Sequence, residues 1–143
     1  MSTRSVIAVE DSATKTVKAI YCHHDGYVLG GVGETLYEYY QDNAKIAALI
    51  ELGSLSSLGK YVAPADGMKH DFDNPAKDVT VAYHRDRQEE YHAPIEYENA
   101  QTLLETAGDE YWAEYAYLWR DGEWLVGSPF EPKNGFVTVE SVL

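Results

Sequence analysis

The chain has 143 residues, 45% of them hydrophobic, which predicts one folded domain spanning residues 1–143. Eleven Lys and Arg against 24 Asp and Glu give a formal net charge of −13, larger in magnitude than the roughly 2–8 that suits a small soluble domain. Such a negative field repels nucleic acid and anionic membranes and attracts basic surfaces, which argues against direct binding to DNA, RNA or lipid.

Two further features bear on location. Apolar runs are only a few residues long, so we expect no membrane-spanning segment and no secretory signal. The chain has a single cysteine, Cys22, which excludes an intramolecular disulfide. Both features favour a cytoplasmic protein.

The first elements in chain order are strands. Residues 4–10 and 16–23 are rich in β-branched and aromatic side chains, and the polar residues 11–15 between them predict a hairpin loop. A glycine-punctuated loop follows at 26–33.

A helical period comes next. Leu36, Tyr39 and Tyr40 predict one apolar stripe. A second helix is expected after it, with Asp42 as its N-cap and Gly53 just past its C-terminus.

The middle of the chain is less regular. Residues 54–78 predict an irregular connection, long enough to suggest either a binding loop or a mobile one. The side chains of residues 79–84 follow an alternating pattern, which predicts a strand. Residues 96–107 predict the clearest amphipathic helix, with an apolar stripe of Ala100, Leu103, Leu104 and Ala107.

A hairpin closes the predicted fold. Residues 115–120 and 123–128 flank Asp121-Gly122, a strong two-residue turn signal. That turn pairs Trp119 with Trp124 and Tyr117 with Val126, and it leaves both faces apolar, so the hairpin should be central and covered on both sides. The sequence therefore predicts an α+β fold: an antiparallel sheet of about five strands with two or three helices packed on it.

The glycine loop resembles a phosphate-binding loop only in part. Gly26 and Gly31 have the spacing of the outer glycines of a P-loop, but Val32 stands where the lysine belongs. A small-nucleotide sponge using residues 26–33 is kept as an alternative hypothesis.

Cys22, His23, His24 and Asp25 form the densest group of reactive side chains. Histidine and carboxylate are suitable ligands for zinc or iron, so a metal-dependent enzyme centred on His23, His24 and Asp25 is a second alternative. No established ligand spacing supports it, and we assign no catalytic residue, metal or cofactor.

Residues 88–119 contain eight acids and no Lys or Arg. Like charges four residues apart destabilise a helix by about 0.2–0.5 kcal/mol per pair, so this bias favours a surface that meets a cationic partner. The expected partner-binding residues are Glu89, Glu90, Glu96, Glu98, Glu105, Asp109, Glu110 and Glu114.

Several strings together resemble a family of small acidic proteins encoded by bacteriophages and prophages. They are Ser-Thr-Arg-Ser at 2–5, Ala-Ile-Tyr-Cys-His-His-Asp-Gly-Tyr at 19–27, Gly-Val-Gly at 31–33, Leu-Ser-Ser-Leu-Gly at 55–59 and Tyr-His-Arg-Asp-Arg at 83–87. The chain departs from the family pattern at His24, Val28 and Gln88. The resemblance implies an accessory phage protein that acts inside a bacterium.

From the charge bias and this resemblance we expect a non-enzymatic inhibitor of a bacterial defence system, anti-CRISPR-like or anti-restriction. The inhibitor would present an acidic surface that mimics nucleic acid to a basic, nucleic-acid-binding host protein or complex.

Overall fold

The N-terminal hairpin forms as the sequence predicts. In the computed structural model, which describes residues 2–143, β1 (Ser5–Glu10) and β2 (Val17–Cys22) pair antiparallel. Asp11 closes the loop between them, because its Oδ1 accepts hydrogen bonds from the N–H groups of Ala13 and Thr14 at 2.8 and 3.2 Å.

The sheet is larger than predicted, and it is mixed rather than antiparallel. It has eight strands in the order β4-β3-β2-β1-β6-β7-β8, with β5 also paired to β2. Strand β1 is parallel to β6, and β2 is parallel to β3. The six further strands are β3 (Leu55–Ser57), β4 (Val81–Ala82), β5 (Ile95–Tyr97), β6 (Tyr115–Arg120), β7 (Glu123–Gly127) and β8 (Phe136–Thr138).

The estimate of five strands was wrong because four of the eight strands have only two or three residues. Strands this short carry no readable alternation, and they are fixed by pairing with distant parts of the chain.

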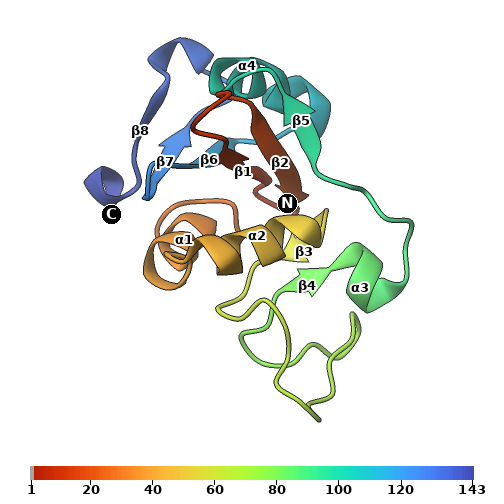
Figure 1. Cartoon of the computed structure of the whole chain (residues 1–143). Helices are drawn as coiled ribbons and strands as arrows, with labels where there is room; N and C mark the ends of the chain where they lie inside the picture. Colours follow the sequence, from red (N-terminus) through yellow and green to blue (C-terminus); the bar gives the residue numbers. More distant parts are fainter. Residues whose placement is uncertain (1) are drawn as a thin grey trace.

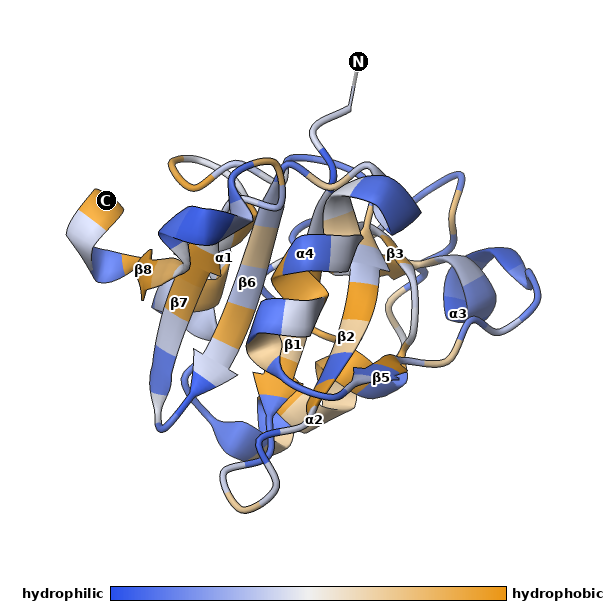
Figure 2. Cartoon of the chain, turned by 90° about the horizontal axis from the view of Figure 1, so that it is seen from above, coloured by the Kyte–Doolittle hydropathy of each residue, from blue (hydrophilic) through white to orange (hydrophobic). Residues whose placement is uncertain are grey.

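Residues 2–143 contain four α-helices, one more than the two or three expected: α1 (Val32–Tyr39), α2 (Asn43–Glu51), α3 (Tyr83–Arg87) and α4 (Ala100–Tyr111). Helices α1 and α2 cover one face of the sheet and α4 covers the other (Figure 1). Viewed from above, α4 lies across the central strands, whose apolar residues form the two cores (Figure 2). Two 3₁₀ turns, η1 (Pro132–Asn134) and η2 (Glu140–Val142), flank β8.

The hairpin of β6 and β7 is central, as predicted. Trp119 pairs with Trp124 and Tyr117 with Val126, and these four side chains join the core under α1 and α2. Leu118 lies on the opposite face, in the core under α4. Both faces of this hairpin are therefore covered by helices.

The second helix, α2, begins and ends at the residues predicted from the sequence. Asp42 accepts a hydrogen bond from the N–H of Ala44 at the start of α2, and Gly53 follows that helix with φ of +75°. Leu36 and Tyr40 are buried as expected, whereas Tyr39 is 39% exposed.

The helix expected at 96–107 starts and ends later. Residues 95–97 form β5, and Asn99 caps α4 by accepting from the N–H of Thr102 at 2.8 Å. The predicted apolar stripe of this helix is buried.

The strand expected at 79–84 is also shorter, because the chain turns into α3 at Tyr83. Asp86 on α3 accepts a hydrogen bond from the N–H of Ala82 at 2.8 Å, which stabilises this turn. Residues 54–78 begin with β3 and are otherwise irregular, as expected. Within residues 2–143, every helix is too short or too polar to cross a membrane.

Candidate binding surface

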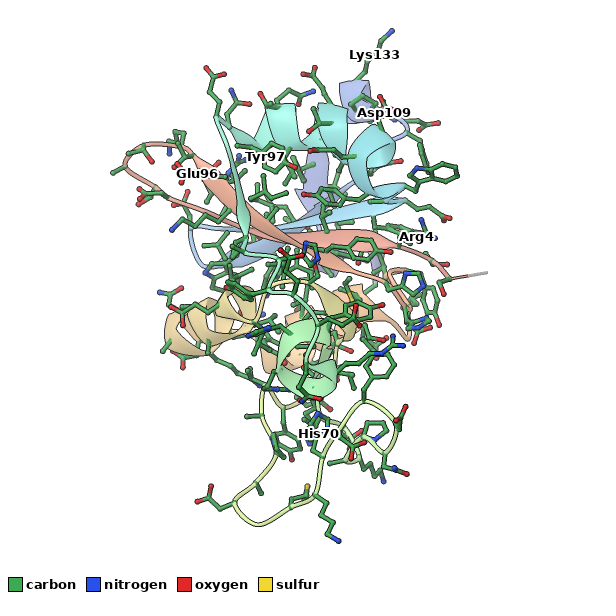
Figure 3. All side chains as sticks on the ribbon, turned by 90° about the vertical axis from the view of Figure 1, so that its right-hand side faces the viewer. Arg4, His70, Glu96, Tyr97, Asp109 and Lys133 are labelled. Carbon is green, nitrogen blue, oxygen red and sulfur yellow. The ribbon has the colours of Figure 1, made fainter. Side chains whose placement is uncertain are left out.

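The outer face of α4 is acidic from its middle turn to its C-terminus, whereas the first turn has no acid. The helix buries Leu103, Leu104 and Ala107 completely, which fixes its rotation on the sheet. This orientation exposes Glu105, on the middle turn, and Asp109 on the last turn. Figure 3 shows Asp109 on the outer side of the molecule, away from the sheet.

All eight expected carboxylates are exposed. Among the described residues only Glu89 of this set forms an ion pair, to Arg87 at 3.4 Å. The other two arginines near this segment bond elsewhere: Arg85 pairs with Asp86 at 2.9 Å, and Arg120 pairs with Glu10 at 2.8 Å. Within residues 2–143, an ion pair therefore neutralises only one of the eight carboxylates.

The eight carboxylates do not form one surface. Glu89 and Glu90 lie on the connection between α3 and β5, far along the molecule from α4 (Figure 1). Glu96 lies on β5 directly opposite Lys18 of β2 and beside α2. Its neighbour Tyr97 points to the other face and packs under α4 (Figure 3). We use the name α4 surface for Glu105, Asp109 and Glu110 of the helix, together with Glu98 just before it and Glu114 just after it.

A chain of hydroxyl groups orients Glu110. The Tyr97 hydroxyl donates to Glu110 Oε2 at 2.8 Å and lies 3.2 Å from the Tyr111 hydroxyl. Burial, together with these two neighbours, raises the pKa of Tyr97 well above its ordinary value, so the phenol keeps its proton. Tyr111 stacks on Tyr21 with ring centroids 5.9 Å apart, which joins the end of α4 to β2.

Trp112 was not among the residues singled out from the sequence. It follows α4 in a left-handed conformation, with φ of +58°, and its side chain is 71% exposed. A bulky residue is strained in this conformation, and an exposed tryptophan next to a charged surface is typical of binding hot spots. The sequence signal that could have found it was the Trp immediately after an acidic helix end.

The His23–Asp25 group does not assemble a metal site. The rings of His23 and His24 lie edge to face, with centroids 4.6 Å apart. His23 Nδ1 contacts the Tyr21 hydroxyl, His24 Nδ1 lies 2.9 Å from Ser2 Oγ, and Asp25 accepts from the Tyr27 hydroxyl. Within residues 2–143, no three His, Cys, Asp or Glu side chains are grouped to hold a metal ion.

The glycine loop is closed by its own hydrogen bonds. The N–H groups of Val32 and Glu34 donate to the carbonyls of Asp25 and Val28, both at 2.8 Å. Gly30 N–H donates to Glu34 Oε1 at 3.1 Å, so this backbone donor is bonded to a carboxylate of the protein itself. A Cβ at Gly31 would lie 2.4 Å from the Asp25 carbonyl oxygen, so close packing requires this glycine.

Comparison with known proteins identifies no relative: no protein-family model, curated protein or solved structure matches this chain.

Proposed function

We propose that this protein is a non-enzymatic inhibitor that occupies a cationic, nucleic-acid-binding groove of another protein with the carboxylates of α4. The observation that carries the proposal is the last turn of α4. It holds Asp109 and Glu110 and no basic residue, although the negative end of a helix dipole favours Lys or Arg there.

This arrangement is unfavourable for folding. Each acid at a helix C-terminus costs about 0.3–1 kcal/mol, and the Glu105–Asp109 pair, four residues apart, adds repulsion. A local arrangement that opposes stability is a sign of a functional surface. A positively charged partner would turn the same repulsion into binding energy.

The spacing on α4 suits such a partner. Glu105 and Asp109 are separated by about 6 Å along the helix axis, close to the axial rise of about 7 Å over two base pairs of duplex DNA. The buried stripe and the Asn99 cap hold the helix rigidly, so little entropy is lost on binding. Trp112 lies beside these carboxylates and would serve as the aromatic anchor.

In the phage context that the resemblance implies, the partner would be a component of a bacterial defence system that binds DNA or RNA. An anti-CRISPR-like or anti-restriction role follows from covering that component's nucleic-acid site.

The test is capture of partners from a bacterial host lysate on the immobilised protein, identified by mass spectrometry. The proposal expects a captured nucleic-acid-binding protein that duplex DNA or RNA displaces. It also expects the captured amount to fall steeply as salt is raised, since exposed charges are screened beyond about 8 Å at physiological ionic strength.

The decisive variant is the triple change Glu98→Lys, Glu105→Lys and Asp109→Lys. It should abolish capture. Asp109→Lys suits the negative end of the helix dipole, but Glu98→Lys places a cation near the positive end, and the changes at 105 and 109 keep two like charges four residues apart, so thermal stability should stay close to that of wild type. A melting temperature close to that of wild type would show that the loss of capture is not caused by misfolding.

The matched control reverses three exposed acids far from α4, by Asp66→Lys, Asp73→Lys and Glu140→Lys. It has the same net charge and should retain capture. Equal capture by both triple variants, or a captured protein that neither duplex DNA nor RNA displaces, would contradict the proposal.

A further inference from the structure

A groove, separate from the α4 surface, lies on the face of the sheet opposite α4. It has a volume of about 740 Å³ and is bounded by the β1–β2 loop, by α2, by the β6–β7 turn and by Glu96 of β5. This volume is within the range of roughly 300–1,000 Å³ that is typical of ligand sites. No residue of the α4 surface lines this groove.

The floor of the groove is apolar. It is formed by Val9 of β1, by Ile46, Ala47 and Ile50 of α2, and by Trp119 of β6. The Trp119 Nε1–H donates to Asn43 Oδ1 at 2.8 Å, which fixes the indole at the base of the groove. An occupant therefore needs an apolar part to cover this floor.

The rim is negative. Five carboxylates line the groove, from Glu10, Asp11, Glu51, Glu96 and Asp121, against one cation, Lys18.

Two of these carboxylates are already engaged. Glu10 accepts two hydrogen bonds from Arg120, at 2.8 and 2.9 Å, which neutralise it. Asp11 binds the loop amides, and the hydrogen bonds from Ala13 and Thr14 lower the pKa of its carboxyl, so it stays charged.

The other three rim acids come from three separate elements. Glu51, Glu96 and Asp121 are exposed, and they form no ion pair within residues 2–143.

We infer that this groove is a docking site for a basic peptide segment of a protein partner, with an apolar side chain on the floor and Lys or Arg side chains at the rim. Charge complementarity selects a cationic occupant. The apolar floor selects one whose charges are carried on aliphatic stems, as in Lys and Arg. The site goes beyond the proposed function, because it lies on the other side of the sheet and shares no residue with the α4 surface.

The experiment is an NMR titration of the full chain, observed at the indole N–H resonances. The probe is the peptide acetyl-Lys-Leu-Lys-Leu-Lys-amide. It should shift the Trp119 indole resonance in a saturable way and leave that of Trp112 unchanged. The acidic counterpart, acetyl-Glu-Leu-Glu-Leu-Glu-amide, should leave both unchanged.

The double variant Glu51→Gln/Glu96→Gln should weaken the lysine peptide about fivefold, since each exposed ion pair contributes modestly. The control Asp66→Asn/Asp73→Asn makes the same change in net charge away from the groove and should have no effect.

Three results would overturn the inference: no shift of Trp119 with the lysine peptide, equal weakening by both double variants, or binding of spermidine as tight as that of the peptide. The last would show a site for free polyamines instead. The α4 triple lysine variant should still bind the peptide, so failure of the groove and failure of the proposed function give different results.

Discussion

The imidazole of His70 meets the carboxylate of Asp86 in a buried contact, with His70 Nε2 3.2 Å from Asp86 Oδ2. The two side chains are only 2% and 4% exposed. On the other side of the ring, Nδ1 accepts the N–H of Ala76 at 2.9 Å, so a neutral imidazole carries its proton on Nε2, which lies close to Asp86 without forming a hydrogen bond of good geometry. This contact ties the irregular segment before β4 to α3.

Asp86 should make stability depend on pH in the acid range. Burial raises the pKa of Asp86, but hydrogen bonds from Arg85 and from the N–H of Ala82 outweigh it and hold the pKa below its ordinary value. A carboxyl with a lowered folded pKa stabilises the protein above its unfolded pKa of about 3.9. That contribution is lost as the pH falls through the folded value.

We expect Asp86→Asn to cost about 2 kcal/mol of unfolding free energy at neutral pH, because Arg85 loses its charged partner and a buried acceptor is lost. The difference from wild type should shrink as the pH falls below about 4. Urea unfolding at several pH values measures both. Asp73→Asn, an exposed change on the irregular segment before β4, should shift the free energy by less than about 0.5 kcal/mol. A wild-type advantage that stays constant down to acid pH would contradict the role assigned to Asp86.

Cys22 should be inert in the folded protein. Burial raises the pKa of its thiol to about 12, and the side chain is inaccessible. Since the thiolate is the reactive form, alkylation by iodoacetamide at about pH 8 should be at least about 100-fold slower in native buffer than in concentrated guanidinium chloride. Rapid labelling of the native protein would instead indicate a reactive cysteine, and it would support the alternative hypothesis of an enzyme centred on residues 22–25.

We expect the Trp112 side chain to lower the unfolding free energy of the protein and to strengthen its binding to the α4 partner. Glycine adopts positive φ without strain, so Trp112→Gly should raise the unfolding free energy by about 1 kcal/mol, which calorimetry measures. The same variant should weaken capture of the α4 partner at least about tenfold, because tryptophan side chains dominate hot spots. Undiminished capture by a stabilised Trp112→Gly protein would remove this residue from the binding surface.

Elements whose signal is local could be predicted from the sequence. The two hairpins, the Trp119–Trp124 register, the Asp42 cap and the buried stripe of α4 each follow from residues close together in the chain. Turn chemistry, capping and helical periodicity act over only a few residues, which is why they can be read from a single sequence.

The sequence alone determined the charge of this protein, its hairpins and the apolar face of its longest helix. Only the tertiary structure decided that β1 pairs in parallel with β6 and that Glu96 lines a groove on the far side of the sheet from Asp109. It also decided that the Asp86 carboxylate lies against the side chains of Arg85 and His70. Such pairings join residues far apart in the chain, and they are chosen by which surfaces can be buried together, a property of the whole fold.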